Sequence, residues 1–288
     1  MASSKLIEPL INQARITRDS LKSASRWQRL SFTDIPAIFG NAMPKSGSHL
    51  VLQILQGLAQ TAPFRYVSAR PVRMITPEGR NRSTQEILKD LQKLRAGAIG
   101  WGYLRSEPDF VDYFNCHKDC FSFFVYRDPR DRLISSIFYA VEIHKGHAQH
   151  DFFSSMPMDE RITAAIKGRD EPGLLHLPNI KEQYARYIGW HDCPTVLCLQ
   201  FEDLIQNSEE TLVTILDFIE ARGFRIPTPR NEALALIQEA IRPDKSPTFR
   251  KGKAGGWREH FTQHHKALFK EIAGDLLIQL GYEHDNNW

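Results

Sequence analysis

The sequence predicts a single α/β domain in which a parallel β-sheet is flanked by helices. Short apolar, strand-like runs alternate with helical patterns, which is typical of parallel sheets. No linker-like tract, internal repeat or low-complexity run divides the 288 residues. Two of the apolar runs end in polar turns that open a helix. Such turns meet at the carboxyl edge of a parallel sheet, where ligands bind, so we expect the functional site there.

The first half of the chain contains one predicted strand and two predicted helices. Residues 34–42 form a short apolar strand, and residues 48–58 form a helix that is apolar on nearly every side and therefore buried. Residues 60–82 are loop-like and rich in Pro, Arg and Thr. An amphipathic helix over residues 83–95 follows, and Ser83 with Glu86 gives it a capping box.

The second half repeats the strand–turn–helix pattern. Residues 121–126 are predicted to form a buried strand that ends in a turn at residues 127–130, and a helix follows over residues 131–141. A further strand over residues 195–200 precedes a helix around residues 208–222.

Composition excludes several classes of protein. With 42% hydrophobic and 25% charged residues, the chain is typical of globular proteins. A net charge of +3 does not indicate nucleic-acid binding, although it is compatible with a local basic pocket for a polyanion. Four cysteines in a chain of this length do not form a disulfide framework. Their loose spacing favours simple thiols over the alternative, a four-thiolate zinc site, and we expect no metal.

The N-terminal residues 1–30 are predicted to form a helical arm, followed by one domain over residues 31–288. The arm is polar and amphipathic and lacks the apolar run of a signal peptide. No stretch approaches the roughly 20 apolar residues of a membrane span. We therefore expect a cytoplasmic protein. The sequence is compatible with a homodimer but does not decide the oligomeric state.

A first candidate motif, Pro-Lys-Ser-Gly-Ser-His, occupies residues 44–49 between a predicted strand and a predicted helix. Amides at a helix N-terminus bind anions, and the helix dipole favours negative charge there. Lys45 adds a cation, and Gly47 lets the backbone approach closely. The G-x-x-x-x-G-K-[ST] spacing of Mg²⁺-dependent nucleotide sites is absent, which argues against a kinase or nucleotide hydrolase. The alternative is a strand–helix turn rich in small residues.

A second motif surrounds Arg127, which ends a predicted strand and can fork onto a phosphate. Ser135 follows about two helical turns later and could add a hydroxyl. The alternative is a salt-bridged turn in which Arg130 and Asp131 cap the helix.

A third motif, Arg250, Lys251 and Gly252, opens a glycine-bearing basic segment over residues 250–257. Glycines allow a loop to fold over a ligand, and the clustered cations favour an anion. The alternative is a solvated basic loop or a nucleic-acid patch.

Together these segments resemble the PAPS-dependent sulfotransferase family over roughly residues 35–265. The resemblance rests on residues 44–49, on YRDPRDRLISS at residues 126–136, on FEDL at residues 201–204 and on FRKGKAGGW at residues 249–257. It implies the P-loop NTPase-like sulfotransferase fold. It also implies transfer of a sulfonate from 3′-phosphoadenosine-5′-phosphosulfate (PAPS) to a hydroxyl or amine of a small-molecule, glycan or lipid acceptor. The products would include the bisphosphate PAP, and no metal would be required.

The resemblance also implies roles for individual residues. Lys45 would contact the oxygen that bridges phosphate and sulfonate and would neutralise charge as the bond breaks. Phe201 would contact the adenine, with core packing as the alternative. The two phosphates would be held by two sets of residues, Ser46, Gly47, Ser48 and His49 at the 5′ end and Arg127, Ser135, Arg250, Lys251 and Gly252 at the 3′ end.

The acceptor's proton requires a base, which in the family is a His between the two phosphate motifs. The corresponding residues 100–106 contain no His, and Tyr103 occupies the place. We therefore predict Tyr103 as the base, which requires that a cation such as Arg105 or Lys45 lower its pKa well below about 10. Further candidates are His49, His144, His147 and Glu142. The alternative is a catalytically degenerate protein that only binds PAPS or PAP.

Two stretches give conflicting indications about the acceptor. Residues 60–82 carry five arginines, which suits an acidic or polar glycan. Residues 140–178 and the aromatic pair just before them carry Phe, Tyr and Met side chains, which suits an aromatic or lipid acceptor. The sequence does not decide between them.

Overall fold

A computed structural model describes residues 2–76, 78–245 and 252–288, with side chains described from residue 11 onward. Within these residues the chain forms one five-stranded sheet in which all pairings are parallel, in the order β2-β3-β1-β4-β5. The strands are β1 (Ala37–Ala42), β2 (Tyr66–Val67), β3 (Ala98–Gly102), β4 (Cys120–Tyr126) and β5 (Val196–Gln200). The predicted parallel α/β fold is confirmed.

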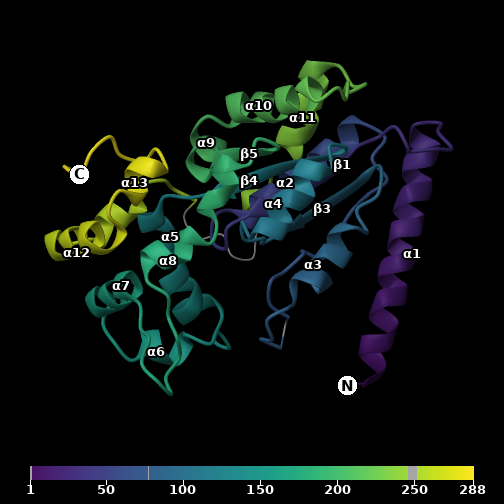
Figure 1. The fold of residues 1–288 in the computed structure, drawn as a ribbon. Helices are drawn as coiled ribbons and strands as arrows, with labels where there is room; N and C mark the ends of the chain where they lie inside the picture. The colour runs from purple at the N-terminus through teal and green to yellow at the C-terminus, as the bar shows by residue number, and fades with distance from the viewer. Residues whose placement is uncertain (1, 77, 246–251) are drawn as a thin grey trace.

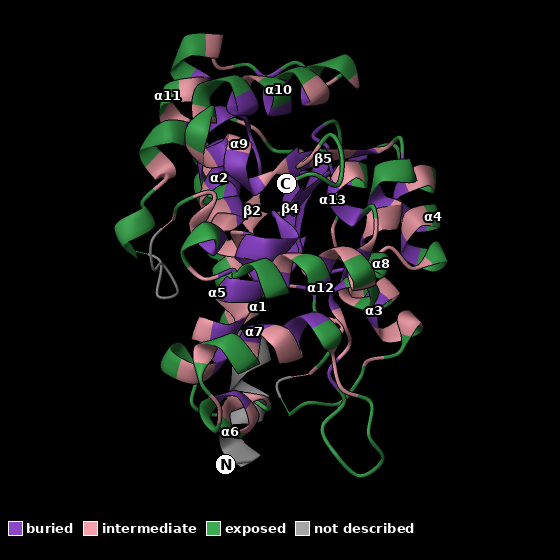
Figure 2. Cartoon of the chain, turned by 90° about the vertical axis from the view of Figure 1, so that its left-hand side faces the viewer, coloured by how far each residue is buried: buried purple, intermediate pink, exposed green. Residues whose placement is uncertain are grey.

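Helices cover both faces of this sheet (Figure 1). One apolar cluster packs α2 (Ser48–Thr61), α9 (Phe201–Gln206), α10 (Ser208–Ala221) and α11 (Arg230–Ala240) against one face. A second cluster joins the other face to α3 (Thr84–Leu91), α4 (Pro108–Cys116), α5 (Pro129–Phe138), α7 (Met158–Lys167), α8 (Ile180–Ala185), α12 (Gln263–Ala273) and α13 (Leu276–Gln279). Every residue of β1, β3 and β4 is therefore buried, as Figure 2 shows for the sheet centre.

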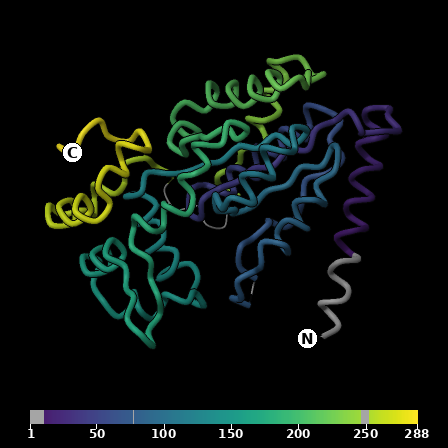
Figure 3. Tube along the Cα trace, in the orientation of Figure 1, coloured from purple at the N-terminus to yellow at the C-terminus, as the bar shows by residue number. Residues whose placement is uncertain are grey.

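Short elements complete the chain. They are α6 (His150–Ser154), a π-helix over Tyr139–Ile143, and 3₁₀ turns over Ile188–Asp192, Pro243–Lys245 and Gly256–Glu259. Helix α1 (Ala2–Arg26) lies at the opposite side of the molecule from α12 and α13 (Figures 1 and 3). None of the helices in the described ranges is long and apolar enough to cross a membrane.

Most predicted elements are present with small shifts at their ends. The predicted helix over residues 48–58 continues to Thr61 as α2, and the Ser83–Glu86 capping box opens α3. The helix predicted over residues 131–141 begins earlier, because Asp128 caps it by accepting from the Arg130 N–H. Strand β3 was not predicted, and β2 lies within the stretch interpreted as a loop.

Helix α5 does not end in an ordinary turn. At its C-terminus the Tyr139 N–H donates to the carbonyls of both Ser135 and Ser136, and the chain continues as the π-helix Tyr139–Ile143. Short π-helices are rare, and those that occur are frequently found at functional sites. This one turns the chain toward the histidine-bearing residues 144–150.

Candidate active site

The loop between β1 and α2 adopts an unusual backbone conformation. Lys45 has φ +70° and Gly47 has φ +84°, both in the left-handed region. A non-glycine residue there costs about 1–3 kcal/mol and persists only where the surroundings enforce it. Gly47 precedes α2 and no side chain caps that helix. The first amides of α2 are therefore available to an anion, as the sequence predicted.

The aromatic ring of Phe201 packs against this loop at Gly47. A Cβ built on Gly47 would stand 2.5 Å from the Phe201 ring, so no larger residue fits at this position. Phe201 itself is only 7% exposed. This burial is compatible with both roles that the sequence left open for Phe201, adenine contact and core packing.

Two hydroxyls of the loop differ in their partners. Ser46 Oγ is fully buried and has no hydrogen-bond partner among the described residues. A buried hydroxyl in that state is suited to a ligand atom. Ser48 Oγ accepts a hydrogen bond from the Tyr103 hydroxyl at 3.0 Å. The predicted base is thus hydrogen-bonded to the loop predicted to hold the 5′-phosphate.

Lys45 points toward the π-helix. Its Nζ lies 3.9 Å from the centre of the Tyr139 ring, a cation–π contact. Burial, and then the nearby charge of Arg127, lower the pKa of Lys45 to about 8. The ammonium is therefore only modestly hydrated and lies where an anionic ligand would stabilise it.

The second motif meets the first and third at Arg127, which follows β4. Its guanidinium donates to the Lys45 carbonyl at 3.5 Å and to the Lys253 carbonyl at 3.2 Å. It also lies 4.7 Å from the centre of the Phe201 ring. Segments from three other parts of the chain therefore converge on this arginine.

Arg127 is paired with Glu202, a carboxylate that the sequence analysis did not single out. Glu202 lies 3.9 Å from the Arg127 Nε and accepts from the Asp128 N–H at 3.2 Å and from the Tyr282 hydroxyl at 2.7 Å. Burial raises the pKa of Glu202 to about 7. The FEDL motif at residues 201–204 contains Glu202, but in the sequence it indicated only a family resemblance and no role for this carboxylate.

Arg130, by contrast, is committed to structural contacts. It pairs with Asp128 at 2.7 Å and with Glu283 at 2.5 Å, and its guanidinium lies 4.1 Å from the centre of the Trp257 ring. The salt-bridged turn considered for this motif therefore exists at Arg130, while Arg127 remains beside the loop.

The third motif is joined to the second through Asp131. One carboxylate oxygen accepts from the Gly255 N–H and the other from the Trp257 N–H, each at 2.7 Å. Asp131 therefore holds the end of the glycine-bearing segment, a role that its reading as a helix cap missed. Arg250 and Lys251, predicted to hold the 3′-phosphate, lie outside the described residues, whereas Gly252 is described with φ +57°.

Among the described residues, no side-chain hydrogen bond or ring contact joins Ser135 or His49 to Arg127. Ser135 is half-buried on α5. His49 is half-buried on the first turn of α2, where burial, and then the charge of Lys45, lower its pKa.

A cluster of aromatic and imidazole rings follows the π-helix. Tyr139 contacts His144 and His147 with ring centres 5.6 and 5.8 Å apart, and the two histidines are 5.9 Å from each other. Burial, followed by His144 and Lys45, lowers the pKa of His147. The cluster therefore lies within the electrostatic reach of Lys45.

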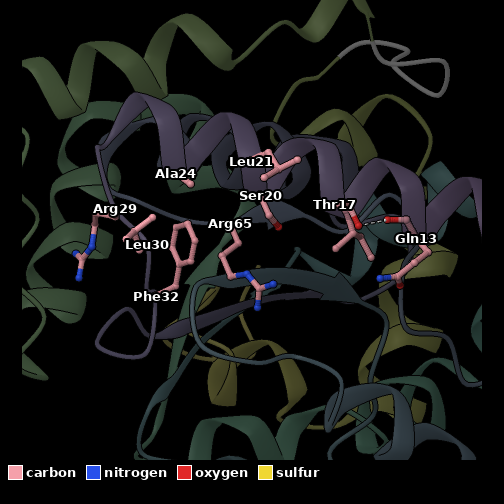
Figure 4. Close-up of a pocket in the computed structure, with 10 residues that line it drawn as sticks. Gln13, Thr17, Ser20, Leu21, Ala24, Arg29, Leu30, Phe32 and Arg65 are labelled. Carbon is pink, nitrogen blue, oxygen red and sulfur yellow. Dashed lines mark hydrogen bonds between the residues drawn. The ribbon is translucent and has the colours of Figure 1, made fainter.

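One pocket is lined in part by a predicted site residue, and a second pocket lies elsewhere. His49 helps line one of about 470 Å³ between α2 and α11, together with Gln53 and Arg242. The other, of about 310 Å³, lies between α1 and the residues around Phe32 and Arg65 (Figure 4). None of the predicted site residues lines this second pocket.

No group of three or more His, Cys, Asp or Glu side chains suited to a metal ion occurs in the described part of the chain. Of the cysteines considered for zinc, Cys116 is exposed, whereas Cys120 and Cys193 are buried.

Comparison with known proteins gives a family and a fold. A family model described as a sulfotransferase domain matches residues 116–281, more than half of the chain. No curated protein matches the chain. Among solved structures, the chain is similar to a mouse sulfotransferase, SULT7A1, complexed with PAP, at 16% identity and a TM-score of 0.57, covering 88% of this chain and 91% of that one. It is also similar to a retinol dehydratase in complex with androsterone and the inactive cofactor PAP, at 18% identity and a TM-score of 0.53, covering 90% of this chain and 85% of that one.

Proposed function

Because this chain belongs to the sulfotransferase family, we propose that it transfers a sulfonate from PAPS to a hydroxyl or amine of an acceptor and releases PAP. The observation that carries this proposal is the convergence at Arg127. Its guanidinium contacts the Lys45 and Lys253 carbonyls, which belong to the two segments predicted to hold opposite ends of the donor. A donor with a phosphate at each end matches two cationic segments held side by side.

We assign the 5′-phosphate and sulfonate to the loop between β1 and α2. The uncapped N-terminus of α2 and the unpartnered hydroxyl of Ser46 suit phosphate oxygens. Lys45, Ser48 and His49 complete this group. Lys45 would neutralise the charge that develops on the departing phosphate as the bond to sulfur breaks.

We assign the 3′-phosphate to Arg127, with Ser135, Arg250, Lys251 and Gly252 as further predicted contacts. Glu202 and Asp131 support this end without touching the donor, since one lies behind Arg127 and the other holds the residues that follow Gly252. Phe201, whose ring lies beside both Gly47 and the Arg127 guanidinium, is the predicted contact to the adenine.

For the acceptor, we favour a hydroxyl-bearing molecule with an apolar or aromatic body. Two of the five arginines that suggested an acidic glycan are engaged elsewhere, since Arg80 pairs with Glu86 at 2.8 Å and Arg82 with Asp90 at 2.6 Å. The ring of Tyr139, by contrast, lies beside Lys45, where an acceptor must approach.

The test is transfer of radiolabelled sulfonate from PAPS to a panel of phenols, sterols, fatty alcohols, amines and oligosaccharides. We expect transfer to at least one ring-bearing or apolar alcohol, and Lys45→Ala to abolish it while the fold is retained. Lys118→Ala, at an exposed position between α4 and β4, is the matched control. PAP binding without transfer to any acceptor would instead favour the degenerate nucleotide-binding protein, and failure to bind PAP would contradict the proposal altogether.

A further inference from the structure

Three histidines after the π-helix differ in how their ring nitrogens are used. His147 Nδ1 accepts from the backbone N–H of Gln149 at 3.2 Å. Because an amide N–H can only donate, this nitrogen carries the lone pair and the neutral ring has its proton on Nε2. The outward nitrogen of His147 is thus a donor and cannot take a proton from an acceptor.

His150 is held in the opposite way. Its Nδ1 lies 2.9 Å from the carbonyl oxygen of Ala140, which can only accept. Nε2 therefore carries the lone pair, so His150 could accept a proton there. Among the described residues, however, its ring does not contact Tyr139, the side chain next to Lys45.

His144 has neither restriction. No described residue hydrogen-bonds to its ring nitrogens, so either can present a lone pair. The side chain is exposed, which leaves it accessible to an incoming acceptor and able to pass a proton to water. Its ring contacts the same Tyr139 ring that carries the Lys45 ammonium.

The distances through Tyr139 are compatible with in-line transfer. The leaving oxygen, the sulfur and the attacking oxygen must lie in a row, so the cation and the base stand roughly 7–10 Å apart. Lys45 Nζ is 3.9 Å from the centre of the Tyr139 ring, and the His144 ring centre is 5.6 Å from that same centre. These two contacts allow a separation in that range.

We propose that His144 is the base that accepts the proton of the acceptor hydroxyl, in place of the predicted Tyr103. The acceptor oxygen bonds to sulfur as its proton passes to a ring nitrogen of His144. The bond from sulfur to the 5′-phosphate oxygen breaks, and its electron pair leaves with PAP beside Lys45. Tyr103 remains with the donor loop, because its hydroxyl donates to Ser48. This inference rests on the proposed sulfonate transfer.

The test compares His144→Ala with His147→Ala, Tyr103→Phe and the exposed control His264→Ala, using the acceptor found in the panel. For His144→Ala we expect a fall in kcat of about 100-fold or more, with unchanged PAP affinity and unfolding temperature. Free imidazole should restore part of the lost rate in His144→Ala and none in Lys45→Ala, an outcome that a purely structural role would not produce.

Near-wild-type kcat in His144→Ala overturns the inference, as does a larger loss in Tyr103→Phe or His147→Ala than in His144→Ala. If the wild-type chain transfers no sulfonate, the proposed function fails first. The inference fails alone if wild type and His144→Ala transfer equally well.

Discussion

The ammonium of Lys45 lies 3.9 Å from the centre of the Tyr139 ring, so the residue predicted to act on the leaving group contacts the start of the π-helix. Tyr139 opens the π-helix that follows α5, whereas Lys45 belongs to the loop before α2. An aromatic face stabilises a partly desolvated cation by about 0.5–2 kcal/mol. The Tyr139 ring therefore stabilises the Lys45 ammonium against the burial that lowers its pKa, and it fixes the direction of the side chain.

Replacing this ring should lower the rate of transfer without weakening donor binding. For Tyr139→Leu we expect kcat to fall by about 2-fold to 30-fold, because the cation–π contact is lost. Tyr139→Phe keeps the aromatic face and should retain nearly the full rate. Steady-state kinetics measures kcat, and PAP affinity is the second readout. Equal losses of kcat in Tyr139→Leu and Tyr139→Phe would assign the effect to the Tyr139 hydroxyl instead.

The lowered pKa of Lys45 predicts an alkaline limit for donor use. The ammonium is charged below a pKa of about 8 and loses its proton as pH rises through that value. Because kcat/KM reports the free enzyme, kcat/KM for PAPS should fall about tenfold per pH unit above pH 8. Lys45→Arg keeps its charge at all these pH values, so its weaker activity should show no such fall. An unchanged alkaline limb in Lys45→Arg would assign the titration to another group.

The sequence predicted β1 and β4, the strands before the two turns that we expect to bind phosphate. It did not predict β3, which lies between β1 and the edge strand β2. β1 and β4 are mostly apolar runs, which signals strands buried on both faces. β3 contains two glycines and resembles a loop. A Cβ at Gly100 would lie 2.6 Å from Leu94, and one at Gly102 would lie 2.4 Å from the Val72 carbonyl. Close packing, which only the fold reveals, thus explains those glycines.

The supporting residues of the site could not be predicted for a related reason. Asp131 meets Trp257, and Glu202 meets Tyr282, across large separations along the chain. Motif spacing marks residues suited to a ligand, whereas a carboxylate that holds another part of the site has no local pattern. Likewise, nothing in the sequence near His144 indicated that its ring would contact the side chain that holds Lys45.

Removing the Asp131 carboxylate should loosen the segment that ends at Trp257. In Asp131→Ala the half-buried amide of Gly255 and the buried amide of Trp257 lose their acceptor, at a cost of about 1–3 kcal/mol for the buried one. We expect PAP affinity, measured by calorimetry, to fall by about 10-fold to 100-fold. Asp131→Asn can keep one of the two bonds and should lie between, while Asp112→Ala on the exposed side of α4 should match wild type. Wild-type PAP affinity in a folded Asp131→Ala would show that Asp131 does not hold this segment for the donor.

The buried Glu202 should make folding stability depend on pH near neutrality. Its pKa is about 7 in the folded chain, against an ordinary value of 4.5, and burial is the main cause. Between these values the folded state binds more protons than the unfolded state, so stability declines as pH rises from about 5 to above 7. The shift corresponds to about 3 kcal/mol.

Glu202→Gln removes this titration and keeps an acceptor for the Asp128 N–H, so it should lose less stability than wild type between pH 5 and pH 8. Urea unfolding at both pH values measures the difference, with Glu271→Gln on the exposed face of α12 as the matched control. Glu202→Gln should also bind PAP more weakly than wild type above pH 7, where the ionised carboxylate would otherwise attract Arg127. If wild type and Glu202→Gln lose stability in parallel, Glu202 is already ionised throughout this range, and its charge must be balanced by Arg127 more strongly than burial opposes it.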